Sequence, residues 1–212
     1  MATRPPAVNR HYVFINCPFD KRYKPLFDAI VFAVHDLGFQ ARHAMVDDDD
    51  AIRLTRIARQ LAGSKYSIHD ISRVEVGGKL KLPRFNMPFE AGIAYCRHHF
   101  AVPGSEHHVL LLDAVPHRYQ AALSDAAGLD PKVHDKDPAR VISNVRDFLV
   151  RASGRGGRSP GAAHIHRRFT LFQTRLPNAA RATRIAMKEL NSWDYVTDLQ
   201  SMMVTWIAAN PP

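Results

Sequence analysis

The segment His11-Tyr12-Val13-Phe14-Ile15-Asn16 decides the fold class of this 212-residue chain. It is short, apolar and rich in β-branched and aromatic residues, which predicts a buried strand. Cys17-Pro18-Phe19-Asp20 interrupts this strand, and apolar residues then recur at helical spacing from Leu26 to Leu37. Gly38 closes the helix, because glycine readily adopts the left-handed conformation found after a helix end. A buried strand followed by such a helix indicates an α/β protein.

The same alternation of strand and helix continues along the chain. Its order predicts a parallel sheet with helices on both faces, a flavodoxin/Rossmann-like α/β fold. A C-terminal helical appendage follows, with an apolar stripe that favours a core or dimer contact over a ligand site. We predict a tail over 1–10, an α/β nucleotide-processing domain over 11–152, a Gly/Arg-rich linker over 153–163 and a helical tail over 164–212. The further predicted strands cover 39–43, 64–71 and 109–113, and the further predicted helices cover 52–63, 90–99, 118–127 and 138–150.

The charge balance allows two interpretations. The formal net charge is +9, and much of the excess lies between Arg151 and Arg184. Such a surplus indicates nucleic acid as a partner, through this basic C-terminal region. The simpler interpretation, which we favour, is a solvated basic face, because no known nucleic-acid-binding motif accompanies it.

Cysteine usage and apolar run lengths predict the compartment. Cys17 and Cys96 are the only two cysteines and form no Cys-x-x-Cys pair, so we expect neither a disulfide framework nor a zinc site. We find no signal peptide and no apolar run of the ~20 residues needed to span a bilayer. We therefore expect a cytoplasmic protein with no membrane partner. Adjacent histidines at 98–99 and 107–108 lack accompanying carboxylates, so we predict no metal, and we expect no cofactor.

Glu90 is the leading candidate for a catalytic residue. It lies in the run Asn86-Met87-Pro88-Phe89-Glu90-Ala91-Gly92-Ile93-Ala94, where apolar neighbours would desolvate its carboxylate. Three loops are expected at the carboxyl edge of the sheet, where ligands bind in such folds: 16–21, 69–73 and 84–90. A simpler alternative is that Glu90 only stabilises the start of a helix through the helix dipole.

Three segments together resemble a known family. Val13–Phe19, Ile68–Ser72 and Asn86–Ala94 look like the nucleoside 2-deoxyribosyltransferase-like group, and they are also similar to the Toll/interleukin receptor (TIR)-like domains that cleave NAD. The resemblance covers roughly residues 12–149, and its most specific part is Glu-x-Gly-x-Ala at positions 90–94. It implies that Glu90 attacks or stabilises the anomeric carbon of a nucleoside. It also implies an enzyme whose site is often completed by a second copy, and hence a homo-oligomer.

The resemblance assigns further roles around Glu90. It implies that Asp70, at a strand end, orients or protonates the base, although an ordinary turn-forming Asp is an equal alternative. His69 is expected to be structural rather than a base. The loop with Pro18 and Phe19 would shape the base pocket. We further predict substrate contacts from residues of the first loop and of the segment before Glu90: Asn16, Asp20, Arg84 and Asn86.

The chain departs from the transferase pattern before Glu90. Arg84, Phe85 and Asn86 stand where a typical transferase has an acidic residue and a glycine, and a basic residue suits a phosphorylated substrate. We therefore predict an enzyme that cleaves or transfers the N-glycosidic bond of NAD or a nucleoside phosphate, with a role in bacterial defence suggested by analogy alone. The alternatives are a nucleotide-sensing module without turnover that signals through its helical tail, and a basic nucleic-acid-associated protein.

Overall fold

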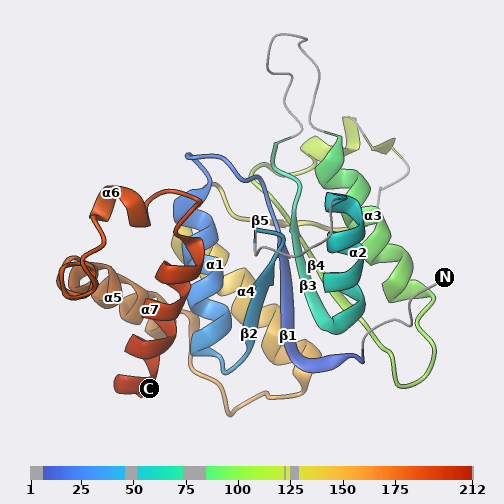
Figure 1. The fold of residues 1–212 in the computed structure, drawn as a ribbon. Helices are drawn as coiled ribbons and strands as arrows, with labels where there is room; N and C mark the ends of the chain where they lie inside the picture. The colour runs from blue at the N-terminus through green and yellow to red at the C-terminus, as the bar shows by residue number, and fades with distance from the viewer. Residues whose placement is uncertain (1–6, 46–51, 74–84, 122, 125–128, 212) are drawn as a thin grey trace, which may run out of the picture. The chain divides into compact units, whose positions relative to one another are not determined.

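The computed structural model describes residues 7–45, 52–73, 85–121, 123–124 and 129–211. Within them the protein is mixed α/β, with a five-stranded sheet that is parallel throughout and helices at the C-terminal end of the chain, which confirms the predicted fold class (Figure 1). The chain divides into two compact units. One unit comprises 1–18 with 40–135, and the other comprises 19–39 with 136–212.

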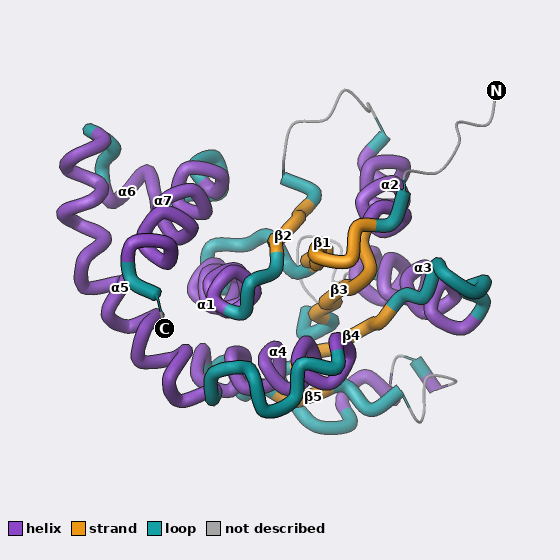
Figure 2. The backbone as a smooth tube through the Cα atoms, turned by 90° about the horizontal axis from the view of Figure 1, so that it is seen from below, coloured by secondary structure: helices purple, strands orange, loops and turns teal. Residues whose placement is uncertain are grey.

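The first unit contains the whole sheet, in the order β2-β1-β3-β4-β5 (Figure 2). This is the flavodoxin-like strand order, with a switch point between β1 and β3. Val13, Phe14 and Ile15 of the first strand are fully buried, as the sequence predicts. The strands are β1 (Asn9–Asn16), β2 (Gln40–His43), β3 (Ser64–Asp70), β4 (His108–Asp113) and β5 (Lys132–Val133).

Two helices of the first unit, α2 (Arg53–Gly63) and α3 (Asn86–His99), pack on one face of the sheet (Figure 2). Phe14 from β1 forms a buried cluster there with Ile57 and Leu61 of α2 and Ala94 of α3. Since side chains alternate between faces along a strand, Phe14 identifies the face onto which Asn16 also projects.

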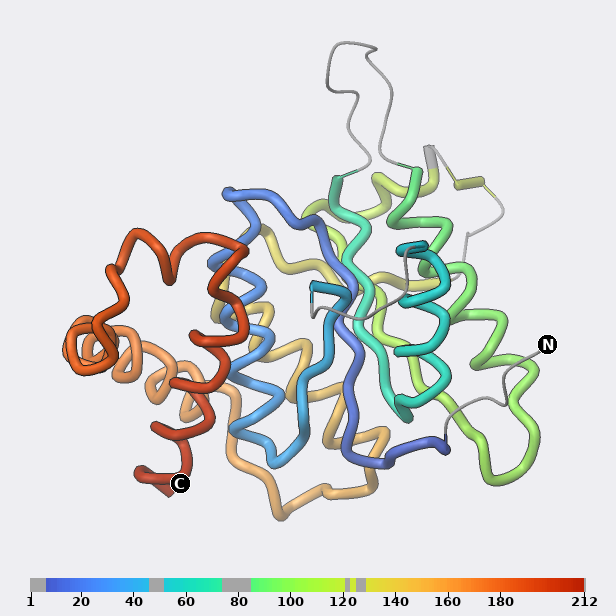
Figure 3. The backbone as a smooth tube through the Cα atoms, in the orientation of Figure 1, coloured from blue at the N-terminus to red at the C-terminus, as the bar shows by residue number. Residues whose placement is uncertain are grey.

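The second unit is helical: α1 (Lys24–Asp36), α4 (Pro138–Ser153), α5 (Ala162–Thr183), α6 (Met187–Leu190) and α7 (Val196–Ala209). Figure 3 traces the last three of these from orange to red. Phe32 of α1 forms aromatic contacts with Phe172 of α5 and Trp206 of α7, with ring centroids 5.7 and 5.9 Å apart. The apolar stripe predicted for the C-terminal region therefore packs inside this unit as core.

Several boundaries differ from the predictions. α3 begins at Asn86, one turn before Glu90, because Pro88 is tolerated in the first turn of a helix. α4 continues to Ser153 and α5 begins at Ala162, which leaves a connection shorter than the predicted 153–163 linker. Of the helix expected over 118–127, the described residues show a 3-10 helix, η1, at Arg118–Ala121, and part of the span lies outside them. β5 has two residues, too few to produce a sequence pattern. The acidic run 47–50 and the Gly77-Gly78 segment lie outside the described residues.

Candidate functional site

The site lies at the carboxyl ends of β1 and β3, beside the switch point of the strand order. Asn16 ends β1, and its register partner on β3 is His69. Partners in register on adjacent parallel strands project to the same face, so both side chains lie on the face covered by α2 and α3. The His69 ring also contacts Phe14, with centroids 6.1 Å apart, which places it on that face independently.

The Asn16 amide joins two other polar side chains. Its Nδ2 lies 3.3 Å from His69 Nδ1, and its side chain also hydrogen-bonds the Glu90 carboxyl. An amide nitrogen has two hydrogens, so one Asn16 NH2 group can donate to both neighbours. In that arrangement His69 accepts through Nδ1 and carries its proton on Nε2. β1, β3 and α3 therefore each contribute one residue to a linked polar group, the Asn16–His69–Glu90 cluster.

Burial shifts both titratable groups of this cluster towards neutrality. Burial, with the nearby His107 as a smaller cause, lowers the pKa of His69 to about 3, so the ring is neutral near pH 7. Burial also raises the pKa of Glu90 above its usual value, and the Asn16 hydrogen bond and the positive charge of Arg53 partly oppose this rise. A raised pKa in a carboxylate beside the switch point is a feature of functional sites.

Each member of the cluster has one buried polar atom without a hydrogen-bond partner. These atoms are Asn16 Oδ1, His69 Nε2 and Glu90 Oε2, judged against the described part of the chain. Buried polar atoms are nearly always paired in folded proteins, because an unmade hydrogen bond costs ~1–3 kcal/mol. Three such atoms on three linked residues make the cluster a candidate site for a group from outside the chain.

Asp70 belongs to a different set of interactions. Its carboxylate accepts hydrogen bonds from the backbone NH and hydroxyl of Ser72, and its Oδ2 lies 2.9 Å from His134 Nε2. Asp70 follows His69 directly on β3, so the two side chains project to opposite faces of the sheet. Ser72 is also held through its carbonyl, which accepts from Arg118, and the same guanidinium pairs with Asp113. The contacts of Asp70 thus lie with this Ser72–Arg118 group rather than with the Asn16–His69–Glu90 cluster.

The other predicted site residues are distributed along the chain. Pro18 is buried just after β1, whereas Asn86 is exposed in the first turn of α3. In the second unit, Asp20 accepts from the backbone NH groups of Arg22 and Tyr23 ahead of α1. Phe19 packs against Phe27 and Trp193, with ring centroids 6.3 and 5.0 Å away. Arg84 lies outside the described residues.

The sequence predicted a structural role for His69, and the structure places it in the Asn16–His69–Glu90 cluster, which sequence reasoning did not identify. It lies two residues after Ser67 and in register with Asn16, so it is on the helix-covered face of β3. The alternation of side chains along β3 can be predicted from the sequence, but the strand that pairs with β3 cannot. Only the strand pairing shows that His69 and Asn16 share one face.

Comparisons with known proteins leave the site to be judged on its own geometry. No family model matches this sequence, and no curated protein matches it. Across the part of the chain that the structure describes, no group of three or more His, Cys, Asp or Glu is arranged to hold a metal ion. The helices described there include none that is both long and apolar enough to cross a bilayer.

Proposed function

We propose that this protein cleaves or transfers the N-glycosidic bond of a nucleotide-type substrate, with Glu90 as the central catalytic residue. The observation that carries the proposal is the Asn16–His69–Glu90 cluster, whose three unpaired polar atoms lie at the switch point of a parallel sheet. The resemblance of the three sequence segments to N-glycosidic enzymes supports the choice of reaction. Ligands of such sheets bind at this edge.

The reaction needs a negative group beside the sugar. When the bond between the anomeric carbon and the base breaks, its electron pair leaves with the base and positive charge develops on the sugar. The ionised Glu90 carboxylate stabilises that charge or bonds the anomeric carbon through Oε2, the oxygen left unpaired. Asn16 holds the carboxylate in place, and the neutral His69 donates a hydrogen bond through Nε2 to the substrate. In this scheme Asp70 positions the strand end through Ser72 and His134.

The proposed substrate class rests on the sequence before α3 and on one positive charge near Glu90. The replacement of an acidic residue by Arg84 before α3 suits a phosphorylated ligand, and Arg53 at the start of α2 contributes positive charge near Glu90. NAD and nucleoside phosphates carry such groups, whereas free nucleosides do not. A role as a bacterial defence effector remains an analogy to TIR-like domains.

Incubation of the purified protein with NAD and a panel of nucleoside phosphates, followed by mass spectrometry of released base, tests the proposal. We expect Glu90→Gln to release base roughly 100-fold more slowly than the parent, or worse, because an amide cannot stabilise the developing charge. Glu106→Gln is the matched control, since Glu106 is exposed and bonds only the loop at Gly104 among the contacts assigned to it. Equal rates for the parent and Glu90→Gln would refute the catalytic role.

A second candidate function is nucleotide sensing without turnover. The raised pKa of Glu90 favours this alternative, because a neutral carboxyl binds a ligand as a hydrogen-bond donor but stabilises positive charge poorly. The pH dependence of base release and of ligand binding distinguishes the enzyme from the sensing module. Cleavage by ionised Glu90 increases as the pH rises through its pKa, whereas binding by neutral Glu90 weakens over the same range. Calorimetric binding that declines with pH, with no base released, would favour sensing.

A further inference from the structure

The basic C-terminal region lacks acidic residues over a long stretch. Residues 148–188 contain eight Arg and one Lys but no Asp or Glu. The stretch covers the end of α4, all of α5 and the turn that leads to α6. A solvated surface that served only solubility would be expected to intersperse both signs of charge. The exclusion of one sign indicates an anionic partner.

Two of these arginines are used inside the second unit. Arg168 is buried and pairs with Asp36, with Nε 2.9 Å from Oδ1. Arg155 lies over the Phe39 ring and donates to the Leu37 carbonyl. Their positive charge is therefore committed to packing and is not offered to a partner.

The other arginines of α5 project outward. Arg167, Arg175 and Arg181 are exposed, and among the described residues none of them forms an ion pair or a side-chain hydrogen bond. At 100° per residue they fall within about 120° of one another and are centred opposite the buried apolar residues of the helix, with Arg175 nearest to the buried Arg168. They span ~21 Å along the helix axis at 1.5 Å per residue. The buried side of α5 comprises Ile165, Arg168, Phe169, Phe172, Leu176 and Ala180.

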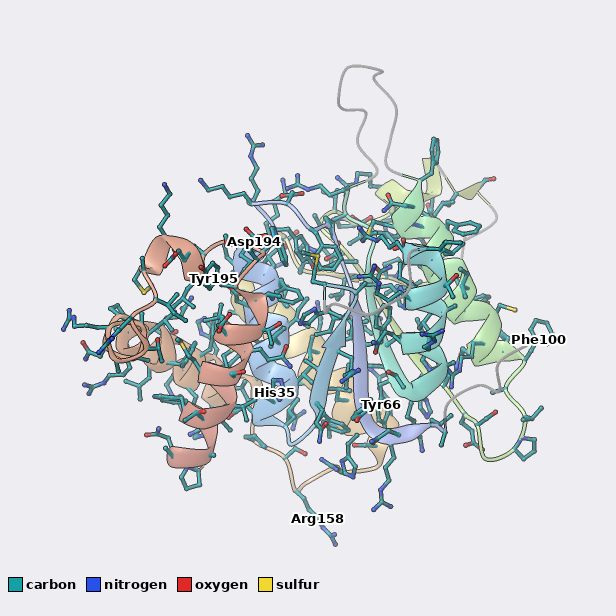
Figure 4. The ribbon with its side chains drawn as sticks, viewed as in Figure 1. His35, Tyr66, Phe100, Arg158, Asp194 and Tyr195 are labelled. Carbon is teal, nitrogen blue, oxygen red and sulfur yellow. The ribbon has the colours of Figure 1, made fainter. Side chains whose placement is uncertain are left out.

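Further cations flank this helix. Arg158, in the turn before α5, is exposed and points away from the ribbon (Figure 4). Arg184, which ends α5 in the left-handed conformation with φ of 60°, is also exposed. Both ends of α5 therefore carry a further exposed arginine.

The composition of this face distinguishes between anionic partners. The aromatic residues of α5, Phe169 and Phe172, are buried, so the helix offers no ring on which unpaired bases can stack. Its apolar side is used within the second unit, and Leu171 is the one large apolar side chain exposed along α5. An interfacial membrane helix needs a free apolar side, which α5 lacks. Exposed cations with no ring for stacking and no free apolar side match the phosphate backbone of a duplex better than unpaired bases or a membrane.

We propose that the outer face of α5, formed by Arg167, Arg175 and Arg181, binds the phosphate backbone of duplex nucleic acid without sequence preference. This surface is separate from the Asn16–His69–Glu90 cluster, and it does not depend on the proposed reaction. It gives the chain a means of associating with nucleic acid whether or not the other site turns over a substrate.

Fluorescence anisotropy of the full chain with a labelled DNA duplex, over a series of salt concentrations, tests this proposal. Three phosphate contacts predict a slope of log K against log salt near −2.7, which weakens binding ~40-fold between 50 and 200 mM. The variant Arg167→Gln/Arg175→Gln/Arg181→Gln should bind far more weakly and lose most of this slope of about 2.7. Glutamine preserves helix propensity, and thermal unfolding of each variant confirms that the fold is retained.

The matched control is Arg10→Gln/Lys132→Gln/Arg140→Gln, which removes three exposed cations from β1, β5 and α4. It lowers the net charge by the same amount, so retained binding by this control shows that position matters rather than total charge. The proposal is overturned if the two triple variants lose equal affinity, or if the parent does not bind duplex at 50 mM salt. Equal or tighter binding to a single strand, or to phosphatidylserine vesicles in place of duplex, would also overturn it.

Discussion

Asp36 and Glu90 are two buried carboxylates with opposite surroundings. Their exposed fractions are similar, 7% and 5%. Asp36, in the second unit, accepts the Nε hydrogen of Arg168 at both carboxylate oxygens, and its Oδ1 also lies 2.9 Å from Arg168 Nη2. Glu90, in the first unit, is bonded by the neutral Asn16 amide and keeps an unpaired oxygen. A buried charge requires compensation, and the first carboxylate is compensated by a charged partner inside the chain, whereas the second has no such ion pair assigned to it among the described residues.

The largest expected effect comes from removing the partner of Asp36. Arg168→Met should lower the free energy of unfolding by about 3–5 kcal/mol, because it leaves the Asp36 carboxylate buried and uncompensated. Urea denaturation monitored by circular dichroism measures the change. Arg167→Met is the matched control on the neighbouring, exposed position and should change stability by less than ~0.5 kcal/mol. If both variants lost similar stability, Asp36 would not depend on its ion pair and the contrast with Glu90 would disappear.

Asp28 shares one feature with each of these carboxylates: a charged partner, as for Asp36, and a raised pKa, as for Glu90. It accepts from Lys24 Nζ at 2.7 Å, yet burial raises its pKa to about 6, with Lys24 opposing the rise. The folded state therefore holds the Asp28 proton more tightly than the unfolded state, whose pKa is 3.8. Its contribution to stability is complete below that value and is lost as the pH rises through about 6.

Asp28→Asn removes this pH dependence. Relative to the parent, the variant should gain roughly 3 kcal/mol of stability between pH 3.5 and pH 8. Denaturant midpoints at several pH values measure the gain. Asp147→Asn, at an exposed carboxylate on α4, should show no such trend, and a flat profile for Asp28→Asn itself would argue against a raised pKa.

Glu90→Gln should also gain stability relative to the parent as the pH rises, but by less than Asp28→Asn. Burial raises the pKa of Glu90, so ionised Glu90 destabilises the fold once the pH exceeds that pKa. Glutamine should therefore be at least as stable as the parent at pH 8, and its advantage should vanish below the usual Glu pKa. A variant that is more stable but slower at releasing base would identify Glu90 as a site residue rather than a structural one. If Glu90→Gln were less stable than the parent, Glu90 would be a structural carboxylate like Asp36.

The smallest expected effects on stability have opposite signs at two glycines. Gly38 has a φ of 76°, so Gly38→Ala should cost about 1 kcal/mol through backbone strain. Gly92 lies within α3, and a Cβ added there meets nothing within 4 Å, so Gly92→Ala should stabilise by ~0.5–1 kcal/mol. Thermal unfolding of both variants measures these two opposite changes in stability. Unchanged base release by Gly92→Ala would show that no substrate approaches this turn of α3.

The sequence was sufficient for the element order but not for the pairing of polar residues. The apolar run at 11–16 predicted β1, and the runs at 64–71 and 109–113 predicted β3 and β4 to within one residue. Asn16 and Glu90 were both identified as candidates, yet nothing in their spacing indicated that one amide would bond the other. Asp70 was paired with Glu90 in the prediction, whereas its contacts lie with Ser72 and His134.

Local patterns were enough to establish a parallel α/β chain with a basic C-terminal region, because periodicity and charge are properties of neighbouring residues. The tertiary structure alone decided which polar groups meet, since Asn16 and His69 are 53 positions apart and touch only through the register of β1 and β3. It also decided that Arg168 turns inward to Asp36 while Arg167 faces outward. Adjacent helical positions differ by 100°, so packing of one apolar side commits Arg168 to the core and leaves Arg167 exposed.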